Sequence, residues 1–143
     1  MNTASKAPWN RRPRVLLAED NLFNAEWGRA ALEHLHCQVR VARDGQAVVA
    51  EVEAEAFDLI LMDRRMPNVD GLEATRVIRW IEAWDERDRT PIVAVTASVM
   101  PQEVAQCLAA GMDDVLAKPF MLNQLSDMLD KWLDTRPCRM QDD

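Results

Sequence analysis

Residues 59 to 71 read LILMDRRMPNVDG, an aliphatic run that leads directly into a carboxylate at Asp63 and then into two arginines. The aliphatic part is typical of a β-strand covered on both faces, as in a parallel sheet. An acid carried to the rim of such a core needs an explanation, and the ends of the other predicted strands provide one.

Short apolar runs alternate with amphipathic segments along most of the chain. The apolar runs predict strands because they are short and mostly β-branched or aliphatic; they cover residues 14–18, 38–42, 57–62, 91–95 and 115–117. The amphipathic segments predict helices; they cover residues 22–35, 44–55, 71–84, 101–110 and 121–133. Five such units predict a doubly wound α/β fold, in which helices cover both faces of an open five-stranded parallel sheet.

Local signals mark several helix ends. Asn21 is expected to cap the first helix. Pro101 suits the first turn of the fourth helix, and Gly111 suits its end. His36, at the exit of the first helix, is expected to adopt a left-handed backbone, which histidine tolerates better than most residues.

The tryptophans permit two interpretations. Trp27, Trp84 and Trp132 fall on the apolar sides of their helices, which predicts core or half-buried packing. Trp80 and Trp84 are four residues apart on one helix, so they could instead extend a docking surface. Trp9 lies in the N-terminal segment outside this pattern.

Composition limits the possible classes of protein. The chain has 143 residues, 48% of them hydrophobic, which suits one domain with its own core. We expect that domain to cover residues 14–133, with tails or linkers at 1–13 and 134–143. The formal net charge of −7 argues against a nucleic-acid-binding surface.

The same sequence favours a cytoplasmic location. No segment approaches the roughly 18 consecutive apolar residues of a membrane span, and the N-terminus lacks the apolar stretch of a secretory signal. Cys37, Cys107 and Cys138 are odd in number and far apart, which favours reduced thiols.

Polar residues gather at the carboxyl ends of four of the five predicted strands. Glu19 and Asp20 follow the first strand, Asp63 ends the third, Thr96 ends the fourth and Lys118 follows the fifth. Ligands of doubly wound sheets bind at this edge. Each residue alone has an ordinary explanation, such as a helix cap or a solvated lysine, but their joint occurrence predicts a site.

The charges of these residues indicate phosphoryl chemistry. Three crowded carboxylates repel one another, and Mg²⁺ would relieve that repulsion because it prefers oxygen ligands. Lys118 and Thr96 offer a positive charge and a hydroxyl donor for phosphoryl oxygens. Asp63 can then act as a nucleophile that takes up phosphate as an acyl phosphate.

These residues stand in motifs that resemble the receiver domains of two-component response regulators. The matching segments are EDN at 19–21, LMDRRMPNVDG at 61–71, VTA at 95–97 and AGMDDVLAKPF at 110–120. The resemblance implies a flavodoxin-like fold with strand order 2-1-3-4-5, and Asp63 as the phosphoacceptor. It also implies that Asp20, Asp63 and the backbone carbonyl of Arg65 bind Mg²⁺ directly, that Glu19 acts through water, and that Thr96 and Lys118 contact the phosphoryl group.

Further residues resemble one branch of this family. EDNLFN at 19–24 and the segment 96–120 are similar to receiver domains of hybrid histidine kinases. Such domains accept phosphate from a histidine kinase and commonly pass it to a histidine phosphotransfer domain. Both an excised domain of this kind and a free-standing regulator agree with the sequence, and the downstream partner is not identified by it.

Three positions are expected to tune the site: Arg65, Ser98 and Val115. Val115 stands where the family usually has an aromatic side chain that rotates as Thr96 moves; valine cannot make that rotation, and it is expected simply to pack in the strand. Arg65, two residues after the acceptor, either shields or pairs with the phosphoryl group, or is an ordinary solvated arginine.

Other functions are also compatible with parts of the sequence. A degenerate receiver would serve as a binding module that does not switch, but the complete set of polar residues argues against it. A Mg²⁺-dependent phosphohydrolase would need a second acid where Arg65 stands, so we expect catalysis only of the domain's own phosphorylation and dephosphorylation. No glycine-rich phosphate loop follows any predicted strand, which argues against a nucleotide site.

Overall fold

A computed structural model describes residues 12–133 of the chain, and a five-stranded sheet forms the centre of this part. The strands run in the order β2-β1-β3-β4-β5, and each neighbouring pair is parallel. This confirms the predicted fold and strand order. The strands are β1 (Arg14–Ala18), β2 (Gln38–Ala42), β3 (Leu59–Asp63), β4 (Ile92–Thr96) and β5 (Asp114–Ala117).

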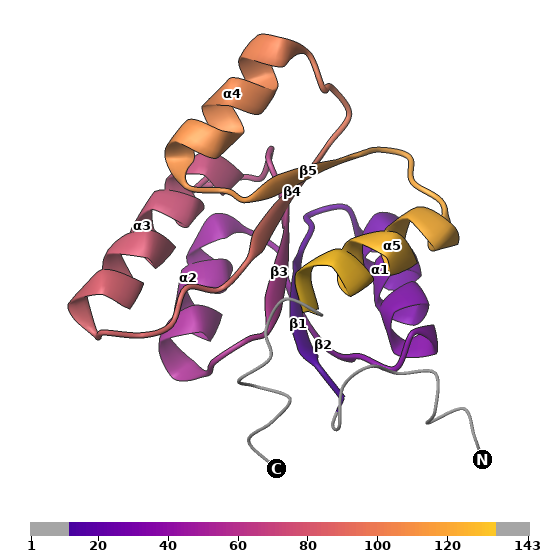
Figure 1. Ribbon diagram of the computed structural model, residues 1–143, viewed down its shortest axis with the longest axis horizontal. Coiled ribbons are helices and arrows are strands. Elements are labelled where there is room, and N and C mark those ends of the chain that lie inside the picture. The colour runs from indigo at the N-terminus through magenta and orange to yellow at the C-terminus, as the bar shows by residue number, and fades with distance from the viewer. Residues whose placement is uncertain (1–11, 134–143) are drawn as a thin grey trace.

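Helices cover both faces of the sheet (Figure 1), because each parallel crossover needs a connection that returns over the sheet. Helices α2, α3 and α4 lie over one face, and α1 and α5 over the other. Their bounds are α1 (Leu22–His34), α2 (Gly45–Ala54), α3 (Gly71–Trp84), α4 (Pro101–Ala110) and α5 (Leu122–Leu133).

The central strands are buried along their whole length, which explains their nearly continuous apolar sequence. All five residues of β3 and all five of β4 are buried. Alternate residues serve the two faces: Ile60 and Met62 pack beneath α2 and α3, whereas Leu59 and Leu61 pack with α1 and α5. The carboxyl ends of β3 and β4 therefore rise directly from the two halves of the core.

Side-chain and backbone geometry at the helix ends follows the predictions. The Asn21 side chain accepts a hydrogen bond from the backbone N–H of Asn24 and so caps α1. Pro101 begins α4, and Gly111 ends it with a left-handed backbone. His36 also has a positive φ of 72°, which agrees with its predicted role in a turn.

Two aromatic side chains do not pack as predicted. Trp84 was expected on the inner side of α3 but is 75% exposed, because the inner face of the last turn is taken by Glu82, which is buried through its ion pair with Arg79. Trp84 instead stacks on the exposed Trp80, with ring centroids 5.5 Å apart. Phe23, which the sequence places at helical spacing with Trp27 and Leu35 on the apolar side of α1, is 79% exposed.

The remaining aromatic and cysteine predictions have mixed outcomes. Trp132 is partly buried against the α1–α5 side of the core, as predicted, and Trp27 is partly exposed. Cys37 and Cys107 are buried free thiols. Trp9, Cys138 and nearly all of the two predicted tails lie outside the described residues.

None of the helices in the described part of the chain is long and apolar enough to span a membrane.

Candidate functional site

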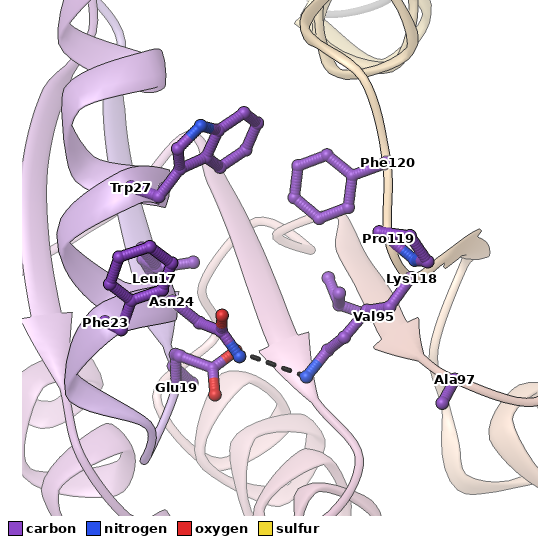
Figure 2. A pocket seen from close by; sticks show the side chains of 12 residues that line it. Leu17, Glu19, Phe23, Asn24, Trp27, Val95, Ala97, Lys118, Pro119 and Phe120 are labelled. Atoms are coloured by element: carbon purple, nitrogen blue, oxygen red, sulfur yellow. Dashed lines mark hydrogen bonds and ion pairs between the residues drawn. The ribbon is translucent and has the colours of Figure 1, made fainter.

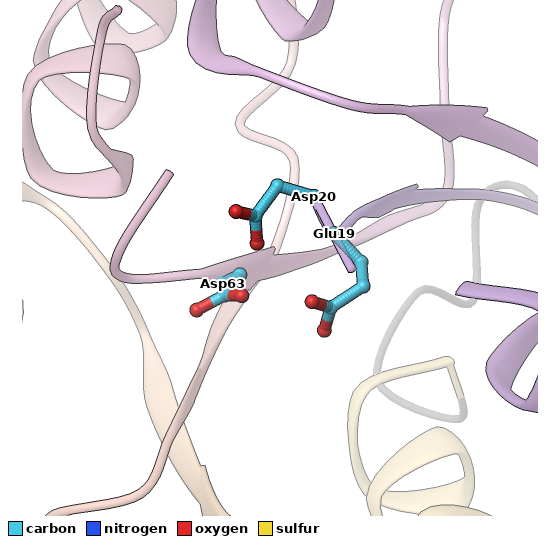
Figure 3. A group of neighbouring side chains, drawn as sticks. All are labelled: Glu19, Asp20 and Asp63. Atoms are coloured by element: carbon cyan, nitrogen blue, oxygen red, sulfur yellow. The ribbon is translucent and has the colours of Figure 1, made fainter. Parts of the chain in front are cut away.

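Three carboxylates meet at the carboxyl edge of the sheet, where the loops after β1 and β3 lie side by side (Figure 3). Glu19 and Asp63 are buried, whereas Asp20 is exposed. Each of the three residues offers an oxygen that lies within 4.8 Å of the other two. The sheet topology brings them together because β1 and β3 are neighbours in space.

Short-range hydrogen bonds orient two of these acids. The backbone N–H of Asn21 donates to Glu19 Oε2 at 3.1 Å, so the residue that caps α1 also fixes this carboxylate. The backbone N–H of Arg65 donates to Asp63 Oδ1 at 3.1 Å. These contacts leave the second oxygen of each carboxylate without a backbone hydrogen bond.

Lys118 links the two buried acids. Its Nζ atom lies 3.2 Å from Asp63 Oδ2 and 3.3 Å from Glu19 Oε1. Burial lowers the pKa of Lys118, but the attraction of Asp63 and Glu19 outweighs it, and the net effect raises that pKa. The lysine therefore stays charged between the carboxylates.

The pKa of Glu19 is raised where these acids lie close together. Burial raises its pKa, and repulsion from Asp63 raises it further, although the Asn21 hydrogen bond and Lys118 act in the opposite direction. A divalent cation at this position would relieve both unfavourable contributions. The donor set, three carboxylates with oxygens close together, is the kind that Mg²⁺ prefers.

A hollow of about 280 Å³ lies over this cluster and collects most of the predicted site residues. Thr96 and Ser98 line its wall after β4, and the Ser98 backbone N–H donates to Thr96 Oγ1 at 3.2 Å. Arg65 lines it after β3, and its side chain is exposed. The structure thus brings together Glu19, Asp20, Asp63, Arg65, Thr96, Ser98 and Lys118.

Val115 is the one predicted tuning residue that does not line this hollow. It is partly buried and packs against the core beneath α2, α3 and α4. Its neighbour in β4 is Ala94, two residues before Thr96. The simple packing interpretation of Val115 is therefore confirmed.

An apolar pocket of about 440 Å³ adjoins the charged hollow and shares Glu19 and Lys118 with it (Figure 2). Trp27 on α1 and Phe120 after β5 face each other across it, in an edge-to-face arrangement with ring centroids 5.5 Å apart. Sequence reasoning did not find this pocket. The only signal was Phe120 directly after the Lys118-Pro119 pair, and its contact with Trp27 depends on the fold.

The sequence model of the response regulator receiver domain matches residues 15–130. The chain belongs to the response regulator receiver domain family. Among curated proteins, sensor protein GacS of Pseudomonas syringae pv. syringae is 43% identical over 123 residues, which are 86% of this chain but 14% of that protein. The receiver domain thus spans only a small part of the length of this relative.

Solved structures resemble the receiver domain along most of its length. The magnesium-bound receiver domain of sensor histidine kinase PA1611 from Pseudomonas aeruginosa is 38% identical with a TM-score of 0.76, covering 86% of this chain and 98% of that one. The receiver domain of Saccharomyces cerevisiae Ssk1, crystallised with the histidine phosphotransfer protein Ypd1, is 28% identical with a TM-score of 0.84, covering 88% and 92%. The chain is therefore a phosphoacceptor domain of the two-component and phosphorelay type.

Proposed function

We propose that Asp63 of this receiver domain accepts a phosphoryl group from a histidine of a partner protein, with Mg²⁺ held by the surrounding acids. The observation that carries this proposal is the meeting of Asp63 with Glu19, Asp20, Thr96 and Lys118 in one hollow. These residues come from the ends of four different strands, so they lie close together because of the fold and not because they are neighbours in the sequence.

The transfer follows from the chemistry of this hollow. An Asp63 carboxylate oxygen forms a bond to phosphorus while the phosphorus–nitrogen bond of the donor histidine breaks, and the electron pair stays on the imidazole nitrogen. Lys118 already lies 3.2 Å from Asp63 Oδ2, where it can neutralise phosphoryl charge. Thr96 supplies a hydroxyl at the same hollow.

Mg²⁺ fits the acids that would hold it. We assign it to Asp20, Asp63 and the backbone carbonyl of Arg65, with Glu19 acting through water. When bound, the ion neutralises the repulsion among carboxylates and phosphoryl oxygens. The raised pKa of Glu19, caused first by burial and then also by Asp63, supports the need for such a cation.

Apolar side chains around the hollow support a protein as the phosphoryl donor. The exposed residues are Leu22, Phe23, Val99, Met100 and Met121, each of which lines the apolar pocket or lies within two residues of one that lines a pocket. Large apolar side chains exposed beside a site commonly mark a protein-binding surface. These side chains give a histidine kinase or a histidine phosphotransfer domain an apolar surface to bury while its histidine reaches Asp63, and the aromatic pocket between Trp27 and Phe120 continues it.

The domain catalyses its own phosphorylation and dephosphorylation in this proposal and turns over no external substrate. The position two residues after Asp63 holds Arg65, where a phosphohydrolase would need an acid to protonate its leaving group. A receiver that does not switch would have no use for the complete set of acids, lysine and threonine. We therefore prefer the phosphoacceptor to the passive binding module, and assign residues 14–133 to it.

Intact-protein mass spectrometry after incubation with a small-molecule phosphodonor tests this proposal. We expect a gain of one phosphoryl group that requires Mg²⁺ and is absent from Asp63→Asn. Asp127→Asn is a matched control because Asp127 is exposed on α5 and does not line the hollow. No gain in the wild-type protein under any condition would favour the passive binding module instead.

A further inference from the structure

The loop between β2 and α2 contributes none of the acids of the site, yet it contacts both loops that carry them. It consists of Arg43 and Asp44, and Gly45 follows as the first residue of α2. One side of it faces the β1–α1 loop with Glu19 and Asp20, and the other faces the β3–α3 loop that follows Asp63. We propose that this loop is a brace that sets the distance between the two halves of the Mg²⁺ site; the inference rests on the proposed function.

The contact with the β1–α1 loop is made by Arg43. Its Nη2 atom donates to the backbone carbonyl of Asp20 at 3.0 Å. One residue earlier, the Ala42 carbonyl accepts a hydrogen bond of 3.0 Å from the backbone N–H of Glu19. The backbone of both acidic residues is thus tied to the end of β2.

The contact with the β3–α3 loop is made by Asp44. One oxygen of this carboxylate caps α2 by accepting from the Ala47 backbone N–H at 2.8 Å. The other accepts from the Asn68 side-chain amide at 3.0 Å. Asn68 has a positive φ of 69°, a conformation that asparagine adopts more readily than most residues.

Gly45 permits the closest approach between these loops. A Cβ atom at this position would lie 2.0 Å from the Val69 carbonyl oxygen, which belongs to the backbone and could not rotate away. A residue with any side chain would therefore push the β3–α3 loop outward. Hydrogen bonds between Arg64 and Val95 and between Gly71 and Arg64 hold the ends of that loop. Met66 and Val69 in its middle pack against the core, and the contact with Asp44 adds a polar restraint at Asn68.

Mg²⁺ affinity measured by titration calorimetry tests the brace. We expect Arg43→Gln and Asn68→Gly each to weaken Mg²⁺ binding roughly 10-fold, the usual consequence of losing a residue that orients metal ligands. Glycine at position 68 keeps the left-handed backbone accessible while removing the side-chain contact. Arg43→Lys, which retains a donor, should restore most of the affinity.

Arg40→Gln is the matched control. Arg40 lies on β2, the strand that leads into Arg43, and pairs with Glu51 on α2, away from both loops. Arg40→Gln removes the same positive charge as Arg43→Gln. Loss of a positive charge by itself favours binding of a cation. Weaker binding by Arg43→Gln but not by Arg40→Gln would therefore reflect position and not charge.

Unfolding temperatures without Mg²⁺ separate positioning from folding. The brace predicts that the variants unfold near the wild-type temperature in the absence of Mg²⁺ and gain less stability from added Mg²⁺. If Arg43→Gln and Asn68→Gly both bound Mg²⁺ with wild-type affinity, the brace would be overturned and the proposed function would stand. The brace would also be overturned if each variant lost as much stability without Mg²⁺ as it lost in Mg²⁺ binding free energy. Failure of the wild-type protein to bind Mg²⁺ would overturn the proposed function together with the brace.

Discussion

Lys118 Nζ lies 3.2 Å from Asp63 Oδ2 and 3.3 Å from Glu19 Oε1, so one ammonium group pairs with two buried carboxylates from different strand ends. Its positive charge offsets the repulsion between the two acids, which lie close to each other in the described structure. The same charge competes with any cation for those oxygens and attracts phosphoryl oxygens.

Lys118→Gln should separate these two effects. Because the competing charge is lost, we expect Mg²⁺ affinity to rise roughly 10-fold, equivalent to about 1.4 kcal/mol. Because a positioned positive charge is lost, we expect phosphorylation by a small donor to slow about 100-fold. Calorimetry and the time course of mass gain measure the two quantities. Lys131→Gln removes the same charge from an exposed lysine on α5 and should change neither the Mg²⁺ affinity nor the phosphorylation rate. If Lys118→Gln also left both quantities unchanged, the role assigned to Lys118 would be contradicted.

Arg65→Ala should shorten the lifetime of phosphorylated Asp63 several-fold. The arginine side chain is exposed at the hollow, while its backbone N–H is fixed by Asp63 Oδ1 at 3.1 Å. A cation held there shields the acyl phosphate from water. Decay of the phosphorylated mass after removal of the donor measures this effect, with Arg76→Ala as the control. Equal lifetimes would show that Arg65 is an ordinary surface residue.

Arg79→Ala should lower the free energy of unfolding by about 3 kcal/mol. Arg79 pairs with Glu82 at 2.9 Å and with Asp113 at 2.8 Å, and it also donates to the carbonyls of Thr90 and Gly111. The Glu82 side chain is only 8% exposed, so loss of the guanidinium would leave a buried charge without its ion-pair partner.

Denaturant unfolding of Arg79→Ala beside Arg76→Ala provides the comparison. Arg76 pairs with Glu73 on the exposed side of the same helix, where both side chains are more than half exposed. Such a pair contributes less than about 1 kcal/mol. If Arg79→Ala and Arg76→Ala lowered the free energy of unfolding equally, burial would not increase the contribution of Arg79 to stability.

The Asp114 contact between β5 and α5 should make stability depend on pH in acid. Burial raises the pKa of Asp114, but hydrogen bonds from Lys131 and Trp132 outweigh burial and hold that pKa below the ordinary 3.8. The folded state therefore binds a proton less readily than the unfolded state. This contribution to stability is present above about pH 3.8 and is lost as the pH falls through the lowered folded pKa.

Asp114→Asn should accordingly cost stability near neutral pH, and the difference from wild type should shrink below about pH 3.8. Denaturant unfolding of both proteins across that range measures the difference. If the stability difference between Asp114→Asn and wild type stayed constant as the pH fell far below 3.8, the role assigned to the Asp114 charge would be contradicted.

The sequence predicts the fold because the central strands are buried on both faces. Their apolar runs are continuous, the helices between them have clear periodicity, and parallel connection then leaves few topologies. The acid cluster is predictable for the same reason, since parallel strands deliver the residues after them to one edge. Asp63 and Lys118 are 55 residues apart in sequence and still meet there.

Features that depend on contacts between distant loops were not predictable. Trp84 lies outside because Arg79 buries Glu82 on the inner face of α3, and that ion pair also needs Asp113 from beyond α4. The brace likewise requires Gly45 to approach Val69, a contact with no periodic signal in the sequence. Local pattern determines the elements, whereas these contacts arise only once the elements pack.

Reduction of the phosphorylated protein with borohydride, followed by peptide mass mapping, tests the central claim most directly. Borohydride converts an aspartyl phosphate to homoserine, so the product marks the acceptor residue. We predict homoserine at position 63, formed only when Mg²⁺ was present during phosphorylation. Homoserine at position 20, or phosphate retained on a side chain other than a carboxylate, would contradict the assignment of Asp63 as the phosphoacceptor.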